Sequence, residues 1–177
     1  INVDYVSIDV DSIDVWLLYG LLADGYRPRV ISVEYNANFP PHMLLACERT
    51  WAPWVRRSRV YGSSAASINM VAEMFGYQVV EIMVSLDMFF VRKDLLKSQC
   101  RNSEQLPNFR TLAENRAGED THRFCNSAQV SRLVDFPLSL IGLEEEAKAK
   151  AIDSVEELNQ WREERGMEAY CNLTTVH

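Results

Sequence analysis

The chain has 177 residues, of which 47% are hydrophobic and 24% charged, and its formal net charge is −7. This composition is typical of one globular domain with a sizeable core and excludes a disordered chain. The acidic balance argues against nucleic acid as the principal partner, because binding a phosphate backbone requires clustered Lys and Arg. No apolar run approaches the roughly 20 residues of a membrane-spanning helix, so we expect no membrane span.

The sequence begins at Ile1 and enters a predicted strand almost at once, which we interpret as a fragment whose N-terminal part is missing. A targeting segment would lie in that part, so the sequence identifies no compartment and the cytoplasm is the default expectation. The cysteines lie far apart and form no CxxC pair, which predicts reduced thiols rather than a zinc knuckle or a disulfide framework. They are Cys47, Cys100, Cys125 and Cys171.

The first predicted strand, residues 5–10, is rich in β-branched residues and ends among carboxylates. In open α/β sheets the ligand crevice lies outside the carboxyl ends of the strands, so we expect Asp9, Asp11 and Asp14 at its rim. A simpler structural role for Asp11 and Asp14 is to stabilise the first turn of the helix predicted over residues 12–24. Gly25 is predicted to end that helix.

A second buried strand is predicted over residues 30–36 and also ends in polar side chains. Strand, helix and strand within about thirty residues is the parallel crossover unit. Since parallel strands place their carboxyl ends together, we expect Glu34 and Asn36 to lie near Asp9 and Asp11.

A long connection is predicted over residues 37–61. Its aromatic residues Phe39, Trp51, Trp54 and Tyr61 either shape a pocket wall or anchor the connection to the core, and the second role is favoured. His42, beside two prolines, is expected on the surface. The only basic cluster, residues 56–59, is interpreted as a solvated loop, with a local anion contact as the alternative.

A helix is predicted to open at Ser63-Ser64 and to close at Gly76. Two strands follow, at residues 77–84 and 88–92, and the connection between them is so short that it permits only an antiparallel hairpin. The predicted fold class is therefore α/β, with parallel strands finished by an antiparallel hairpin.

Residues 5–16, 26–39 and 89–92 resemble the C-terminal half of a class I S-adenosylmethionine-dependent methyltransferase, closest to the FkbM-like group. That group shows an I-D-V-E-G-x-E-like signature after its fourth strand. The signature matches residues 8–14 position by position, with Asp11 for Glu, Ser12 for Gly and Asp14 for Glu. The resemblance covers about residues 3–96, and no counterpart of the family's glycine-rich cofactor loop occurs in this sequence.

The resemblance implies a Rossmann-like methyltransferase sheet, of which residues 1–98 form the C-terminal half, followed by a polar, acidic, partly helical extension over residues 99–177. It implies methyl transfer from S-adenosylmethionine to an oxygen of a small-molecule or glycan acceptor, with Mg²⁺ as an optional cofactor. The implied catalytic residues are Asp9, Asp11 and Glu34, and the implied cofactor contacts are Asp9 and Val10. The metal ligands would be Asp11, Glu34 and Asn36, and the substrate contacts Asn36, Asn38, Trp51 and Trp54.

Two alternatives stay open. Asp9-Val10-Asp11 after an apolar strand also fits the D-x-D pattern with which many glycosyltransferases hold a divalent metal on a nucleotide sugar. The other alternative is a non-catalytic relative whose methyltransferase-like fold serves as an interaction module.

Beyond residue 98 the sequence predicts less. Residues 130–143 are apolar enough to pack onto the sheet, and residues 144–168 form a helix candidate. Its apolar stripe consists of Ala147, Ala151, Val155, Leu158 and Trp161. An amphipathic helix covering the domain is favoured over a partner-binding helix. Asn172-Leu173-Thr174 matches the N-glycosylation pattern, and a chance match is favoured because nothing in the sequence indicates secretion.

Overall fold

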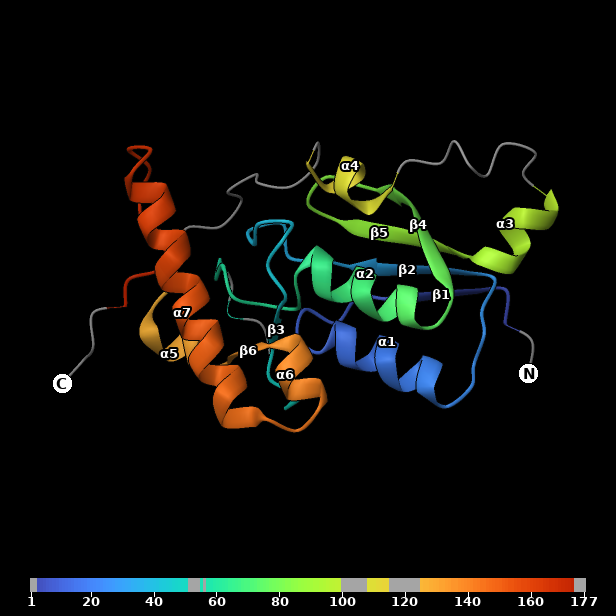
Figure 1. Ribbon diagram of the computed structural model, residues 1–177, viewed down its shortest axis with the longest axis horizontal. Coiled ribbons are helices and arrows are strands. Elements are labelled where there is room, and N and C mark those ends of the chain that lie inside the picture. The colour runs from blue at the N-terminus through green and yellow to red at the C-terminus, as the bar shows by residue number, and fades with distance from the viewer. Residues whose placement is uncertain (1–2, 51–54, 56, 100–107, 115–124, 174–177) are drawn as a thin grey trace.

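The computed structural model of the chain describes residues 3–50, 55, 57–99, 108–114 and 125–173. In this part of the chain the fold is mixed α/β, with a four-stranded sheet, a separate two-stranded sheet and seven helices (Figure 1). None of the helices described there has both the length and the apolar character that crossing a bilayer requires.

The four-stranded sheet has the order β1-β2-β5-β4. β1 (Tyr5–Ile8) and β2 (Val30–Glu34) are parallel, which confirms the predicted crossover unit. β4 (Tyr77–Ile82) and β5 (Asp87–Arg92) pair antiparallel, which confirms the predicted hairpin. The hairpin turns back so that β5, its second strand, lies between β2 and β4 and is antiparallel to both.

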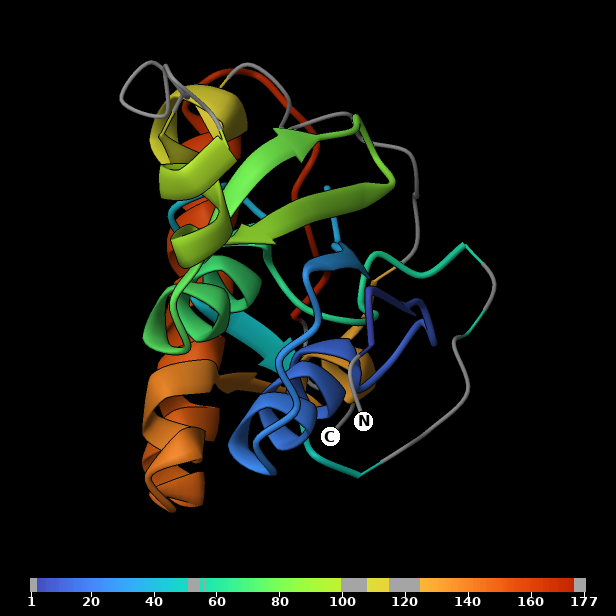
Figure 2. The ribbon, with the colours of Figure 1, turned by 90° about the vertical axis from the view of Figure 1, so that its right-hand side faces the viewer.

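Helices α1 (Asp14–Ala23) and α2 (Ala65–Met74) lie on the same side of this sheet (Figure 2). Ser64 accepts a hydrogen bond from the backbone N–H of Ser67, so the predicted opening of α2 is confirmed. The predicted end of α1 is confirmed as well, because Gly25 follows it with a φ of 89°.

The buried face of α1 contains Leu18 and Leu22, which are fully buried, whereas Leu17 is 42% exposed. Because α1 is apolar on nearly all sides, the spacing of its apolar residues does not identify the face that packs on the sheet.

The second sheet joins the two regions that the sequence predicts, residues 1–98 and the extension over residues 99–177. β3 (Leu45–Cys47) lies inside the predicted long connection, and its antiparallel partner β6 (Leu133–Asp135) lies in the predicted extension. The regions 1–98 and 99–177 therefore share a sheet.

Three helices surround this small sheet: α5 (Ser127–Val130), α6 (Phe136–Leu140) and α7 (Glu144–Glu163). α7 runs along the outside of the molecule, as Figure 1 shows. Four members of its predicted apolar stripe are buried: Ala147, Ala151, Val155 and Leu158. Trp161 is 47% exposed instead, because Arg162 takes the next inward position and donates to the carbonyl of Glu168 at 2.6 Å.

Trp16 of α1 connects the two sheets. Its indole Nε1 donates to the carbonyl of Cys47 in β3 at 2.8 Å, and its ring lies 4.8 Å from that of Phe136 in α6. The predicted packing of residues 130–143 onto the domain is thus confirmed. Two further helices, α3 (Lys93–Gln99) and α4 (Phe109–Glu114), contact β5 and β4 respectively.

The prediction of reduced, unpaired cysteines is wrong for two of them. Cys125 and Cys171 form a disulfide with a Cα–Cα distance of 4.7 Å. They are 46 residues apart, so no short-range spacing signals the pair. Cys47 is a free thiol in β3, and burial raises its pKa to about 12, which makes it unreactive. Cys100 lies outside the described residues.

Candidate functional site

A buried carboxylate shapes the loop between β1 and α1. Asp14 is fully buried, and its two oxygens accept hydrogen bonds from the backbone N–H groups of Val10 at 2.8 Å and Ser12 at 3.0 Å. The Ser12 hydroxyl donates to the carbonyl of Val10 at 3.2 Å. Asp14 thus fixes the position of the residues on either side of Asp11.

The predicted helix-capping role of Asp11 is wrong. The N-cap of α1 is Ile13, which makes no side-chain capping bond, while Asp14 lies in the first turn as expected. Asp11 instead adopts a φ of 57°, in the left-handed region that Asp tolerates better than most residues. Ser12 occupies the position of the signature glycine without a positive φ, so this loop does not require glycine there.

The carboxylates of Asp9, Asp11 and Glu34 come together at one edge of the sheet. Each offers an oxygen, and these oxygens all lie within 4.8 Å of one another. Asp9 directly follows β1, and Glu34 is the last residue of β2. Because Ile8 pairs with Val33 in the parallel register, the two strands end side by side, as the sequence predicted. We call these three residues the acidic group.

Glu34 has a strongly raised pKa. Burial raises its pKa to about 8, and the nearby charges of Asp11, Asp9 and Asp14 add to the shift. Among the described residues, its buried Oε2 has no hydrogen-bond partner. Burial is also the main cause that raises the pKa of Asp14. A carboxyl group that titrates near neutral pH at this position can exchange a proton with a ligand.

Tyr61 and Asp87 are neighbours of the acidic group. Burial raises the pKa of the Tyr61 phenol, and the charges of Glu34 and Asp11 raise it further. Asp87 pairs with Glu34 across the β2–β5 ladder, and burial together with the charge of Asp9 raises its pKa. Sequence reasoning missed Asp87, which only the antiparallel position of β5 beside β2 could have identified, and named Tyr61 without placing it near the carboxylates.

The three carboxylates of the acidic group could hold a divalent cation. Carboxylate oxygens are the ligands that Mg²⁺ prefers, and a cation would offset the mutual repulsion that raises the pKa of Glu34. The buried Glu34 Oε2, which has no hydrogen-bond partner in the described part of the chain, is an available ligand atom. These candidate ligands differ from the predicted ones, Asp11, Glu34 and Asn36, because Asp9 lies with the other two carboxylates.

Asn36 has a structural role instead. It is fully buried, and its amide nitrogen donates to the carbonyls of Arg59 at 2.7 Å and Tyr61 at 2.9 Å. Its amide oxygen accepts from the backbone N–H and the side chain of Asn38 at 2.9 and 2.8 Å. These contacts use the whole amide to hold two loops together, so the structure does not place Asn36 with the acidic group.

The predicted substrate contacts have separate outcomes. Asn38 is 8% exposed, its Oδ1 has no partner among the described residues, and it lines a cavity of about 420 Å³. The opposite wall of this cavity is α7, including Trp161. Trp51 and Trp54 lie outside the described residues.

Other residues of the long connection differ in burial. Phe39 and Tyr61 are buried in agreement with the anchoring interpretation, and His42 is exposed as expected. The basic cluster is not simply a solvated loop, because Arg59 is 3% exposed and donates to the carbonyl of Tyr170 at 2.6 Å. Arg57 is exposed.

Comparisons with models of protein families, with curated proteins and with solved structures find no match to this chain. The function is therefore inferred from the fold and from the acidic group.

Proposed function

We propose that this chain belongs to an S-adenosylmethionine-dependent methyltransferase that transfers a methyl group to an oxygen of a small-molecule or glycan acceptor. The observation that carries the proposal is the meeting of Asp9, Asp11 and Glu34 at the carboxyl ends of two parallel strands. This is the edge of an α/β sheet at which ligands bind.

The sheet supports the proposal. The resemblance in residues 3–96 implies parallel strands finished by an antiparallel hairpin, and β1, β2, β4 and β5 have this arrangement. The signature-like run over residues 8–14 supplies two members of the acidic group and the buried Asp14 that shapes their loop. The exposed Asp9 and Val10 occupy the loop position that the resemblance assigns to cofactor contact.

Methyl transfer to a hydroxyl requires in-line placement of the acceptor and removal of its proton. Glu34 is placed to accept that proton, because its pKa of about 8 lies close to neutral pH. Asp9 and Asp11 are placed to orient the hydroxyl through hydrogen bonds. When bound, S-adenosylmethionine supplies the electrophilic methyl group.

A divalent cation is the second component of the proposal. Asp9, Asp11 and Glu34 would hold it through their carboxylate oxygens. With a cation held there, Glu34 would serve as a ligand rather than as the base, and the cation would supply the positive charge that makes an acceptor hydroxyl easier to deprotonate. The predicted ligands Asp11 and Glu34 are retained in this set, and Asn36 is not.

Labelled methyl transfer to a panel of hydroxyl and glycan acceptors, with and without Mg²⁺, tests the proposal in the complete protein. Glu34→Gln should lower turnover about 10²- to 10⁴-fold, the usual contribution of a general base. Asp11→Asn should remove any Mg²⁺ dependence. Asp4→Asn is the matched control, because Asp4 lies before β1 at the opposite end of the strand and its side chain forms an exposed ion pair with Arg29. Unchanged turnover of both site variants would contradict the proposal.

A glycosyltransferase is the alternative that a specific observation favours. In the D-x-D run, carboxylate oxygens of Asp9 and Asp11 lie within 4.8 Å of each other and of a Glu34 oxygen. Thermal shifts of the complete protein separate the possibilities. S-adenosylmethionine should raise the melting temperature if the proposal holds, and a nucleotide sugar with Mn²⁺ should raise it if the alternative does. No shift with either ligand would favour a non-catalytic module.

A further inference from the structure

We propose that this chain folds in the oxidising compartments of a secretory pathway and is N-glycosylated there on Asn172. The inference rests on the disulfide and on the exposed sequence beside it, and it is independent of methyl transfer. It replaces the default expectation of the cytoplasm.

The disulfide is a structural one. Cys125 is 9% exposed and Cys171 2% exposed, and both belong to the core cluster that includes Leu133 of β6 and Val155 of α7. Buried disulfides of this kind form and persist in oxidising compartments and are rare in the cytosol, where they are mostly transient and catalytic. Burial of both sulfurs argues against such a transient role.

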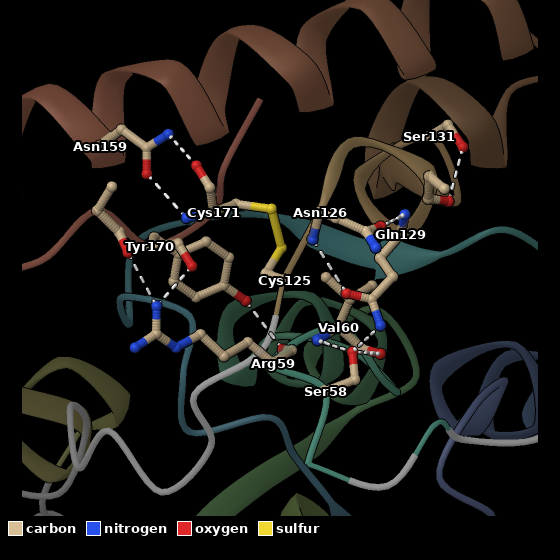
Figure 3. Close-up of a disulfide and its surroundings, with 12 residues drawn as sticks. Ser58, Arg59, Val60, Cys125, Asn126, Gln129, Ser131, Asn159, Tyr170 and Cys171 are labelled. Atoms are coloured by element: carbon tan, nitrogen blue, oxygen red, sulfur yellow. Dashed lines mark hydrogen bonds between the residues drawn. A yellow bond between two sulfur atoms is a disulfide. The ribbon is translucent and has the colours of Figure 1, made fainter. Parts of the chain in front are cut away.

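The chain on either side of Cys171 is arranged around the bond, as Figure 3 shows. Asn159 of α7 holds the Cys171 backbone from both sides, donating to its carbonyl at 2.8 Å and accepting from its N–H at 3.0 Å. Arg59 donates to the carbonyls of Ala169 and Tyr170, and the Tyr170 hydroxyl donates back to the carbonyl of Arg59 at 2.9 Å. These bonds, formed by three separate segments, place Cys171 beside Cys125.

The glycosylation sequence begins at the next residue. Asn172-Leu173-Thr174 is the only Asn-x-Ser/Thr run without proline in the 177 residues. Asn172 is exposed, and its backbone N–H donates to the carbonyl of Cys125 at 3.3 Å. The position is thus held on the surface next to the disulfide, where a glycan can extend into solvent without entering the core. We favour modification over a chance match, because buried structural disulfides are typical of oxidising compartments, which include the one in which such sequences are modified.

Both reactions have defined co-reactants. The two thiols lose two protons and two electrons to the disulfide of an oxidoreductase, which becomes a dithiol. For the glycan, the Asn172 side-chain nitrogen bonds to the anomeric carbon of a lipid-diphosphate-linked oligosaccharide. The bond from that carbon to the diphosphate oxygen breaks, and the amide proton leaves with the lipid diphosphate.

The test is expression of the complete protein, with its own N-terminal sequence, in cultured eukaryotic cells. Peptide N-glycosidase should increase its electrophoretic mobility and convert Asn172 to Asp in the peptide mass spectrum. The mobility change should be lost in Asn172→Gln and in Thr174→Ala, and kept in Thr174→Ser, which preserves the pattern. A non-reduced digest should contain Cys125 and Cys171 in one linked peptide.

Two outcomes would overturn the proposal. In one, the protein stays in the cytosol with the thiols of Cys125 and Cys171 free to react with an alkylating reagent. In the other, it passes through the secretory pathway with Asn172 unmodified. Methyl-transfer assays on the same preparations report separately on the proposed activity, so failure of one proposal is distinguishable from failure of the other.

Discussion

The four-stranded sheet and the small sheet beside it are stabilised in different ways. In the first, strands of four to six residues bury a continuous apolar core that includes Ile31, Val33 and Phe90. In the second, two strands of three residues depend on helices α5 to α7, on a disulfide and on side chains that bind backbone carbonyls. A region that buries a smaller apolar core needs covalent and polar links to hold its loops.

If apolar packing alone stabilises the four-stranded sheet, truncating a side chain of its core should lower the free energy of unfolding more than loss of the disulfide or a change of pH does. Phe90→Ala in β5 removes a fully buried ring and should lower the free energy of unfolding by about 3–5 kcal/mol in urea denaturation. Phe89→Ala is the matched control, because Phe89 is only partly buried on the opposite face of the same strand, and its loss should be nearer ~1 kcal/mol. Equal losses would refute the assignment of the core to one face.

The second region should respond to loss of its covalent link. The double variant Cys125→Ser/Cys171→Ser should lower the free energy of unfolding by about 2–4 kcal/mol, because the disulfide no longer restricts the unfolded chain. Hydrogen exchange should accelerate at α5 and at residues 170–173 and stay unchanged in β1 and β2. Acceleration throughout the four-stranded sheet would show that the two regions unfold as one unit. Reduced wild-type protein should match the variant.

A smaller effect is expected from pH at the acidic group. The pKa of Glu34 is about 8 when folded, against an ordinary value of 4.5, so between these pH values the folded protein binds the extra proton. The free energy of unfolding should therefore fall as pH rises from about 4.5 to about 8. Because Glu34 is only half-buried, solvent screening limits this effect to the order of 1 kcal/mol.

Denaturation at pH 6 and pH 9 measures this effect. Glu34→Gln should reduce the difference between the two values, and Asp4→Asn should leave it as in the wild type. A Glu34→Gln variant with the full pH dependence would exclude Glu34 as its source. Mg²⁺ should restore stability at pH 9 in the wild type and not in Glu34→Gln, if the acidic group binds it.

The same comparison explains how much of the fold could be predicted. Strands β1, β2, β4 and β5 were visible because each is an apolar run bounded by turn residues, and their order along the chain limited how they could pair. Strand β3 could not be predicted, because three residues within a long irregular stretch are too few to show the alternation of apolar and polar residues typical of a strand. The Cys125–Cys171 bond joins residues 46 positions apart, and sequence alone gives no distance between them.

The candidate site was predicted in part for a related reason. Strand ends are local features, so Asp9, Asp11 and Glu34 could be placed together from the parallel crossover alone. The burial of Asn36 depends on the carbonyls of Arg59 and Tyr61, which a loop of unknown path brings beside it. The buried position of Asp14 similarly depends on the turn that it holds, and a carboxylate in the first turn of a helix is usually solvated.

The pairing of β3 with β6 affects the order in which the two sheets can form during synthesis. Leu45 pairs with Asp135, so the ribosome adds ninety further residues before the partner of β3 exists. At typical elongation rates this takes roughly 5–18 s. By then the whole β1-β2-β5-β4 sheet has been synthesised, whereas the edge of β3 that pairs with β6 has no partner until residues 133–135 follow.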